Sequence, residues 1–138
     1  SIDSNVLSII KKGINLNQIE KAIDLTREVG IKTNLFLMIG NPNDTIKTAD
    51  KIISFVKKTK INGVHLSMAI PILGTPFWNW VEKNGSWLDY DNEEFLDWPI
   101  DDVDESYPVF ETKDFSANER MEGYNKIRNF LKEKELLL

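Results

Sequence analysis

The stretch FLMIGNPND, residues 36–44, holds the residue types best suited to lining a ligand site. An apolar run ends at Gly40, and Pro42 and Asp44 follow within four residues. A glycine at a strand end lets a ligand approach the backbone, and a helix beginning after Asp44 offers free amide groups. The same residues also suit a simple turn, with Asn43 or Asp44 capping the helix. The residues alone leave both interpretations open.

A second stretch, VHLSMAIPILGTP, residues 64–76, repeats this design. Side chains alternate between the two faces of a strand, so His65, Ser67 and Ala69 share one face. Polar and small residues on an otherwise apolar strand are typical of a face that lines a cavity. His65 would serve as a base or as a hydrogen-bonding group for a substrate, although a lone strand histidine is often a hydrogen-bonded core residue.

Helical and strand patterns alternate along the elements that must position these residues. Spacing and caps predict the order helix, strand, helix, strand, helix over residues 14–29, 31–40, 45–59, 63–71 and 76–84. On the first strand, Phe36, Met38 and Gly40 would share one face. Short loops between such elements are typical of parallel strands with right-handed crossovers, and so of an α/β layer or part of a barrel.

The composition limits the class of protein. The 138 residues are 41% hydrophobic and 28% charged, which is typical of a soluble globular domain. No apolar run approaches the roughly 20 residues that cross a bilayer, and the start does not resemble a signal peptide. There is no cysteine and a single histidine, so thiolate metal sites and His-rich sites are excluded and the cytoplasm is the expected compartment.

Charge is distributed unevenly. Ten of the 22 acidic residues, and no Lys or Arg, fall within residues 84–112, which also carry irregularly spaced aromatic residues. We interpret this segment as an extended arm whose rings dock on the domain. The alternatives are an acidic recognition loop and a disordered linker. A final helix follows, capped by Ser116, and Leu136–Leu138 either pack on the body or fray. The small Lys57–Lys60 cluster is typical of a solvated helix end and makes nucleic-acid binding an unlikely function.

Residues 1–86 resemble the C-terminal half of a radical SAM enzyme barrel, most of all the group that often carries an N-terminal cobalamin-binding domain. Three motifs carry the resemblance in order: SIDSNVLSIIKKG, IGNPNDT and PILGTPF. They match the family patterns ES-G-s-d-x-v-L-x-x-i-x-K-G, I-G-x-P-G-E-T and P-x-P-G-T-x-L/F. The sequence departs from these patterns at Asn43, Asp44 and Leu73, and Asn41 stands at the x position where the family usually has leucine.

The resemblance implies an α/β fold, with residues 1–86 forming strands five and six of a partial (β/α) barrel and their outer helices. Residues 87–138 would form the acidic aromatic arm and a C-terminal helical extension. The parent would be an oxidoreductase-like enzyme that uses S-adenosylmethionine (SAM) and a 4Fe-4S cluster, and cobalamin where the N-terminal domain is present. The cluster cysteines would lie outside this chain, which therefore receives no metal ligand and no catalytic residue.

The resemblance also implies which residues line the pocket. Phe36, His65 and Ser67 would face the barrel interior, where an unknown substrate sits. The SAM-binding residues would be Met38, Ile39, Gly40, Pro42, Asp44, Ile70, Pro71 and Ile72.

Two classes of function follow. In the first, the chain is a fragment of a radical SAM enzyme, inactive alone, whose exposed strand edges favour self-association. In the second, it is a self-sufficient α/β binding module whose acidic aromatic arm recognises a partner. A third and weaker alternative is a complete phosphate-binding domain at Gly40, which would lack a P-loop lysine.

Overall fold

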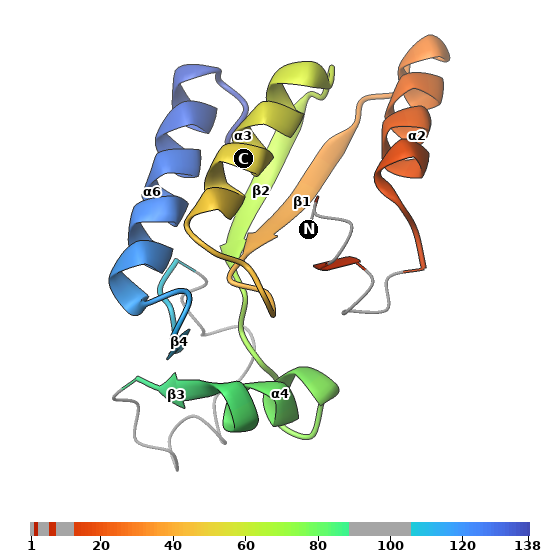
Figure 1. The fold of residues 1–138 in the computed structure, drawn as a ribbon. Helices are drawn as coiled ribbons and strands as arrows, with labels where there is room; N and C mark the ends of the chain where they lie inside the picture. Colours follow the sequence, from red (N-terminus) through yellow and green to blue (C-terminus); the bar gives the residue numbers. More distant parts are fainter. Residues whose placement is uncertain (1, 3–5, 8–12, 89–105) are drawn as a thin grey trace.

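The computed structural model describes residues 2, 6–7, 13–88 and 106–138 (Figure 1). This part of the chain is a mixed α/β structure with four helices and a small parallel sheet. The helices are α2 (Leu16–Glu28), α3 (Lys47–Lys58), α4 (Pro76–Asn84) and α6 (Ala117–Glu133). The strands are β1 (Asn34–Ile39), β2 (Gly63–Met68), β3 (Gly85–Trp87) and β4 (Phe110–Thr112).

Strands β1 and β2 pair in parallel, in a register that runs from Asn34 opposite Gly63 to Ile39 opposite Met68. The parallel pairing predicted from the alternating pattern is therefore confirmed. The second edge of β2 is occupied by the chain end, because the Val64 amide donates to the Leu136 carbonyl at 2.7 Å. The Leu138 amide donates to the Val64 carbonyl at 3.0 Å, so the terminal leucines pack on the body.

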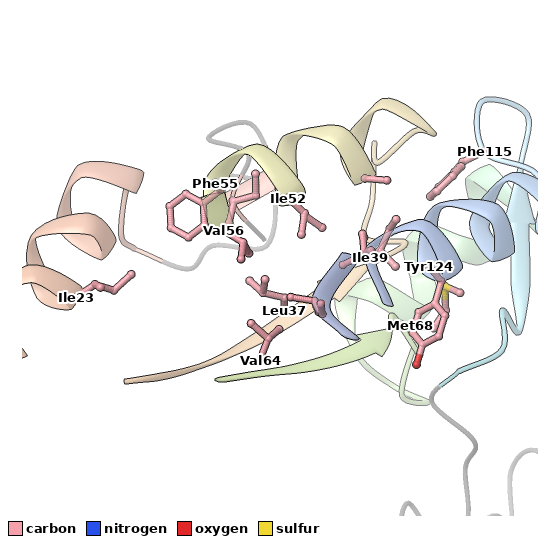
Figure 2. Close-up of a cluster of buried hydrophobic side chains, with 14 residues drawn as sticks. Ile23, Leu37, Ile39, Ile52, Phe55, Val56, Val64, Met68, Phe115 and Tyr124 are labelled. Carbon is pink, nitrogen blue, oxygen red and sulfur yellow. The ribbon is translucent and has the colours of Figure 1, made fainter. Parts of the chain in front are cut away.

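One face of this sheet carries the main core. Leu37, Ile39, Val64 and Met68 are buried there, beneath apolar side chains of α3 and α6 (Figure 2). These helices contribute Ala49, Ile52, Phe55 and Val56 from α3 and Tyr124, Ile127 and Leu131 from α6. Burying a side chain of this size stabilises the fold by about 1.5–3 kcal/mol, so this face accounts for much of the stability. Helix α6, from the predicted C-terminal extension, shares this core with β1.

A second, smaller core lies beyond the carboxyl ends of β1 and β2 (Figure 1). There β3 and β4 form an antiparallel pair, with Trp87 opposite Phe110, and both pack with Val81 of α4. The sequence pattern of the acidic segment did not predict this pair of strands, because three residues are too few to show an alternation of apolar and polar side chains. The middle of the predicted arm, residues 89–105, lies outside the described residues.

Several predicted helix starts are confirmed. Asn15 and Gln18 form the predicted capping box at α2, and α4 begins at Pro76 as predicted, with Thr75 as a cap that was not predicted. Ser116 caps α6 in a second capping box. In each case the side-chain oxygen accepts a hydrogen bond from a first-turn amide that has no partner within the helix.

No barrel is formed by the residues that the structure describes. Their parallel sheet consists of β1 and β2, extended by a single bridge between Val64 and Leu137. The described residues therefore form an α/β unit with one open sheet face.

Candidate functional site

The two predicted strand ends lie side by side. The Ala69 amide donates to the Ile39 carbonyl at 2.8 Å, which continues the parallel ladder one step past the strands. Gly40 and Ala69 are therefore neighbours, and the buried Pro71 follows two residues later. The structure thus places Ile39 and Gly40, from the first group of predicted cofactor residues at 38–44, beside Ala69, which directly precedes the second group at 70–72.

The loop after β1, residues 40–45, is organised by a buried carboxylate, and we refer to it as the tip loop. Asp44 is only 3% exposed. Its Oδ2 accepts the amides of Gly40 and Asn41, at 3.0 and 2.9 Å, and the Asn41 Nδ2 at 3.3 Å. Its Oδ1 accepts the Thr48 hydroxyl at 3.3 Å. Burial raises the pKa of Asp44, and these hydrogen bonds act in the opposite direction.

The prediction that Asn43 or Asp44 caps the following helix is wrong. Helix α3 begins at Lys47, and its N-cap residue Ile46 makes no side-chain capping bond. The Asp44 side chain turns back to the Gly40 and Asn41 amides, and Asn43 takes the left-handed conformation with φ of 64°. The helix begins at Lys47, three residues after Asp44. The Asp44 carboxylate is not available as a cap, because it accepts the amides of the preceding turn instead of those of the first helical turn.

A residue that the sequence analysis missed completes this loop. Arg120 of α6 is 1% exposed, and its Nη1 donates to the Gly40 carbonyl at 3.1 Å. Its Nε donates to the Phe115 carbonyl at 3.0 Å, and its guanidinium lies 4.0 Å from the centre of the Phe110 ring. Burial lowers the pKa of Arg120 to about 10, partly offset by the charge of Asp44.

A signal for Arg120 was present in the sequence. Position 120 falls on the same helical stripe as Tyr124, Ile127 and Leu131, at spacings of four, seven and eleven. An arginine on an apolar stripe predicts a buried cation that needs acceptors. The sequence does not say which acceptors, since Gly40 lies 80 positions away.

The glycine of the tip loop has a specific steric role. Gly40 has a φ of +98°, and a Cβ at this position would lie 2.7 Å from the Arg120 Nη1. It would also contact the Met68 sulfur at 3.5 Å. The space that the missing side chain leaves is therefore filled by Arg120 from the core side. The expected alternation, which grouped Gly40 with Phe36 and Met38, stops at this positive φ.

The other predicted face is open. Phe36 is 80% exposed and Met38 is 38% exposed, although both lie in the strand that contributes Leu37 and Ile39 to the core. Phe36 stacks on His65 of β2, with ring centroids 4.7 Å apart and planes inclined by 12°. Ser67 lies opposite Met38 in the register. We call this surface the open sheet face; its residues are Asn34, Phe36, Met38, His65 and Ser67.

An apolar groove follows the outer side of β1. It has a volume of about 290 Å³ and runs between α2 and the strand, and we call it the edge groove. Its lining is almost wholly apolar; the residues are Ile14, Gln18, Ile19, Ala22, Ile23, Thr26, Thr33 and Leu35. Within the described residues β1 pairs with β2 alone, so this groove lies along an unpaired strand edge.

The second strand-end loop presents apolar side chains. Ile72 and Leu73 are about half exposed, and Gly74 has a φ of +78°. The Thr75 hydroxyl donates to the Ile72 carbonyl at 2.6 Å and accepts the Trp78 amide at 3.2 Å. This loop is thus tied to the start of α4 while Ile72 remains accessible.

Neither metal ligands nor a membrane span emerge from the structure. Among residues 13–88 and 106–138, no three His, Asp or Glu side chains group in a way that would hold a metal ion, and the sequence has no cysteine. No helix in the described ranges has the length and apolar character needed to cross a membrane.

Comparison with known proteins yields a distant relative. The chain is similar to an uncharacterised methyltransferase of Pyrococcus horikoshii, with 29% identity over 84 residues. The matched region covers 61% of this chain and 18% of the relative, so the chain matches less than a fifth of that protein's length. No family model matches the chain, and no solved structure matches it.

Proposed function

We propose that this chain is part of a radical SAM enzyme and contributes one wall of its SAM and substrate pocket. The chain would supply the last two strands of a partial (β/α) barrel, and it would be inactive alone. Substrate would lie over Phe36, His65 and Ser67, and the SAM nucleoside would lie at the strand ends near Met38–Gly40 and Ile70–Ile72.

The observation that carries this proposal is the open sheet face. A parallel strand is normally buried on both faces, and residues 35–39 of β1 have the all-apolar sequence of such a strand. Here one face is packed against α3 and α6, whereas Phe36 on the other face is 80% exposed. The inner wall of an incomplete barrel would have this pattern, because the facing strands would belong to another part of the protein.

The edge groove supports the same arrangement. A strand that paired with the outer edge of β1 would place alternate side chains above Leu35 and Ile23, where the groove is apolar. That strand would also satisfy the outward backbone groups of β1. An unprotected edge of six residues without charges is otherwise a site of unwanted pairing.

The distant relative supports a SAM-related function. Its name describes a methyltransferase, and SAM is the common methyl donor of such enzymes. Its matched region is a minor part of its length, as expected if this segment works within a larger protein.

The fit of the cofactors can be judged from the residues present. The partly exposed side chains of Met38 and Ile72 at the strand ends support the proposed nucleoside position, because they offer apolar contacts for a base. SAM bound there would supply the 5′-deoxyadenosyl group, and this chain's residues would orient it and keep water from the pocket. A 4Fe-4S cluster does not fit this chain, which has no cysteine, and no cobalamin-binding group is assigned to it.

The polypeptide encoded upstream of Ser1 tests the proposal most directly. We expect a Cys-x-x-x-Cys-x-x-Cys segment about 100 residues before Ser1, given roughly 30 residues for each strand–helix unit of such a barrel. Produced together with that polypeptide, the chain should bind SAM in titration calorimetry, and Phe36→Ala should leave SAM binding intact while impairing turnover. Absence of SAM binding would contradict the proposal.

The alternative, a self-sufficient binding module, predicts a different solution state. The isolated chain should self-associate if β1 presents an unpaired edge, whereas a finished module should be a monomer of 15.9 kDa. Size-exclusion chromatography with light scattering separates the two. A clean monomer over a tenfold range of concentration counts against the fragment.

A further inference from the structure

The contact between Arg120 and the tip loop joins two parts of the chain that the sequence analysis treated separately. Gly40 belongs to the predicted barrel segment, and Arg120 belongs to the predicted C-terminal extension. Burying a guanidinium is costly, and an apolar side chain of similar length would fill the same space more cheaply. Arg120 therefore contributes something more specific than packing.

The hydrogen bonds show what Arg120 contributes. The peptide between Gly40 and Asn41 is held at both ends, since Arg120 donates to its carbonyl at 3.1 Å and Asp44 accepts its amide at 2.9 Å. The preceding peptide is held in the same way, with the Ala69 amide on the Ile39 carbonyl and Asp44 on the Gly40 amide. Two successive peptides at the strand end are thus fixed in orientation.

Arg120 itself is held by the C-terminal segment. Its Nε bonds the Phe115 carbonyl, and its guanidinium lies over the Phe110 and Phe115 rings, at 4.0 and 4.8 Å from their centres. Phe110 belongs to β4, which pairs with β3. The orientation of the tip loop is therefore set from the β3–β4 pair and from α6.

We propose that Arg120 is a positioning residue of the nucleoside site, which holds the buried Gly40–Asn41 peptide and thereby fixes the strand end whose exposed side chain, Met38, SAM would contact. This inference rests on the proposed function of the strand ends. It makes the C-terminal extension a structural part of the cofactor site. It also explains why residue 40 is a glycine, because any side chain there would displace the guanidinium.

Amide hydrogen exchange in the isolated chain tests the local effect. Arg120→Lys keeps the charge, but a single ammonium cannot reproduce the planar fork that bonds two carbonyls. We expect the Gly40 and Asn41 amides to lose about 10-fold more protection than the core amide of Ile52, as loss of one charged hydrogen bond implies. Arg120→Met should give a larger effect if it folds.

The control is Lys126→Met on the same helix. Lys126 pairs with Asp50 of α3 at 2.8 Å and makes no contact with the tip loop that the structure records. It should leave the ratio of loop to core protection unchanged within twofold. Equal losses at loop and core amides in Arg120→Lys would show a general stabilising role and overturn the proposal.

SAM affinity of the chain produced with its upstream polypeptide tests the site itself. Arg120→Lys should weaken SAM binding about 10-fold, with Lys126→Met unchanged, and the exchange pattern should change in parallel. Wild-type binding with no weakening in Arg120→Lys overturns the positioning role alone. Failure of the wild type to bind SAM contradicts the proposed function, and with it the role of Arg120 toward SAM. The hydrogen-exchange result then still decides whether Arg120 orients the tip loop.

Discussion

The tip loop and the open sheet face belong to the same two strands, yet they differ in how far this chain completes them. In the tip loop every buried polar group named above has a partner from within the chain, including the carboxylate of Asp44 and the guanidinium of Arg120. On the open sheet face, Phe36 stacks on His65 and remains exposed to solvent.

This difference separates a region that the chain completes by itself from one that it leaves exposed. Contacts within the chain hold the tip loop, so substitutions there should lower stability in addition to any effect on a bound nucleoside. The open sheet face adds little to the stability of this chain, because its apolar surface remains in water. Under the proposed function, the aromatic pair of Phe36 and His65 is the surface that substrate would cover.

The largest loss of stability should come from a substitution on the core side of β1. Ile39→Ala shortens a fully buried side chain of the main core, and we expect a loss of about 3–4 kcal/mol in the free energy of unfolding. Urea denaturation followed by circular dichroism measures it. A loss below about 1 kcal/mol would mean that the core can close over the cavity, and the contrast between the two faces would weaken.

Gly40→Ala should have the next largest effect. The new Cβ meets the Arg120 Nη1 at 2.7 Å and also forces alanine into a positive φ, which together should cost about 3 kcal/mol. Gly74→Ala is the matched control, because Gly74 also has a positive φ but has no atom within 4 Å of the added Cβ. It should cost only about 1 kcal/mol in the same thermal or urea measurement.

A double-mutant cycle sharpens this result. In an Arg120→Met background the steric part of the Gly40→Ala penalty should shrink, since the more flexible thioether can move aside. Equal penalties for Gly40→Ala in both backgrounds would show that backbone strain alone makes glycine necessary at this position.

The pH dependence of stability should report the buried carboxylate of the tip loop. Burial raises the pKa of Asp44 above its ordinary value of 3.8, so the folded state holds this proton more tightly than the unfolded state. The contribution of Asp44 is therefore fully present below pH 3.8 and is lost as pH rises through the raised pKa. Asp44→Asn, which cannot ionise, should lack this loss.

Unfolding free energies of the wild type and Asp44→Asn, measured in urea from pH 3 to 7, test the sign. The stability of the wild type relative to the variant should fall as pH rises. A relative stability that rises with pH would mean that the hydrogen bonds to Asp44, together with the charge of Arg120, outweigh desolvation.

The smallest effect on stability should come from the open sheet face. Phe36→Ser changes a side chain that is 80% exposed, so the free energy of unfolding should move by less than about 0.5 kcal/mol. The same change should reduce self-association in light scattering, because it removes apolar surface from the unpaired strand. A loss above about 2 kcal/mol would show that Phe36 is already packed within this chain.

Local patterns in the sequence predicted much of the fold. Helix α2 with its Asn15 cap, helix α4 with Pro76 at its start, and α6 with its Ser116 cap follow from contacts within four residues. The two strands were also predictable, because their apolar runs end at Gly40 and Pro71. The division of faces, with Phe36 apart from Leu37, follows from alternation alone.

The misses share a physical origin. The β3–β4 pair joins residues 85–87 to residues 110–112, and neither segment is long enough to show a period. Asp44 was assigned to the helix cap because local rules do not anticipate the competing amides of the preceding turn. The partners of Arg120 lie on a loop 80 residues away and on rings of a separate strand.

The sequence by itself determined which residues sit on which face of two parallel strands, because side-chain alternation and helical periodicity are properties of a few consecutive residues. Only the tertiary structure decided that Arg120 fills the space beside Gly40, and that one face of the sheet stays open. Those outcomes depend on which distant segments reach the same point in space, and sequence spacing carries no direct measure of that distance.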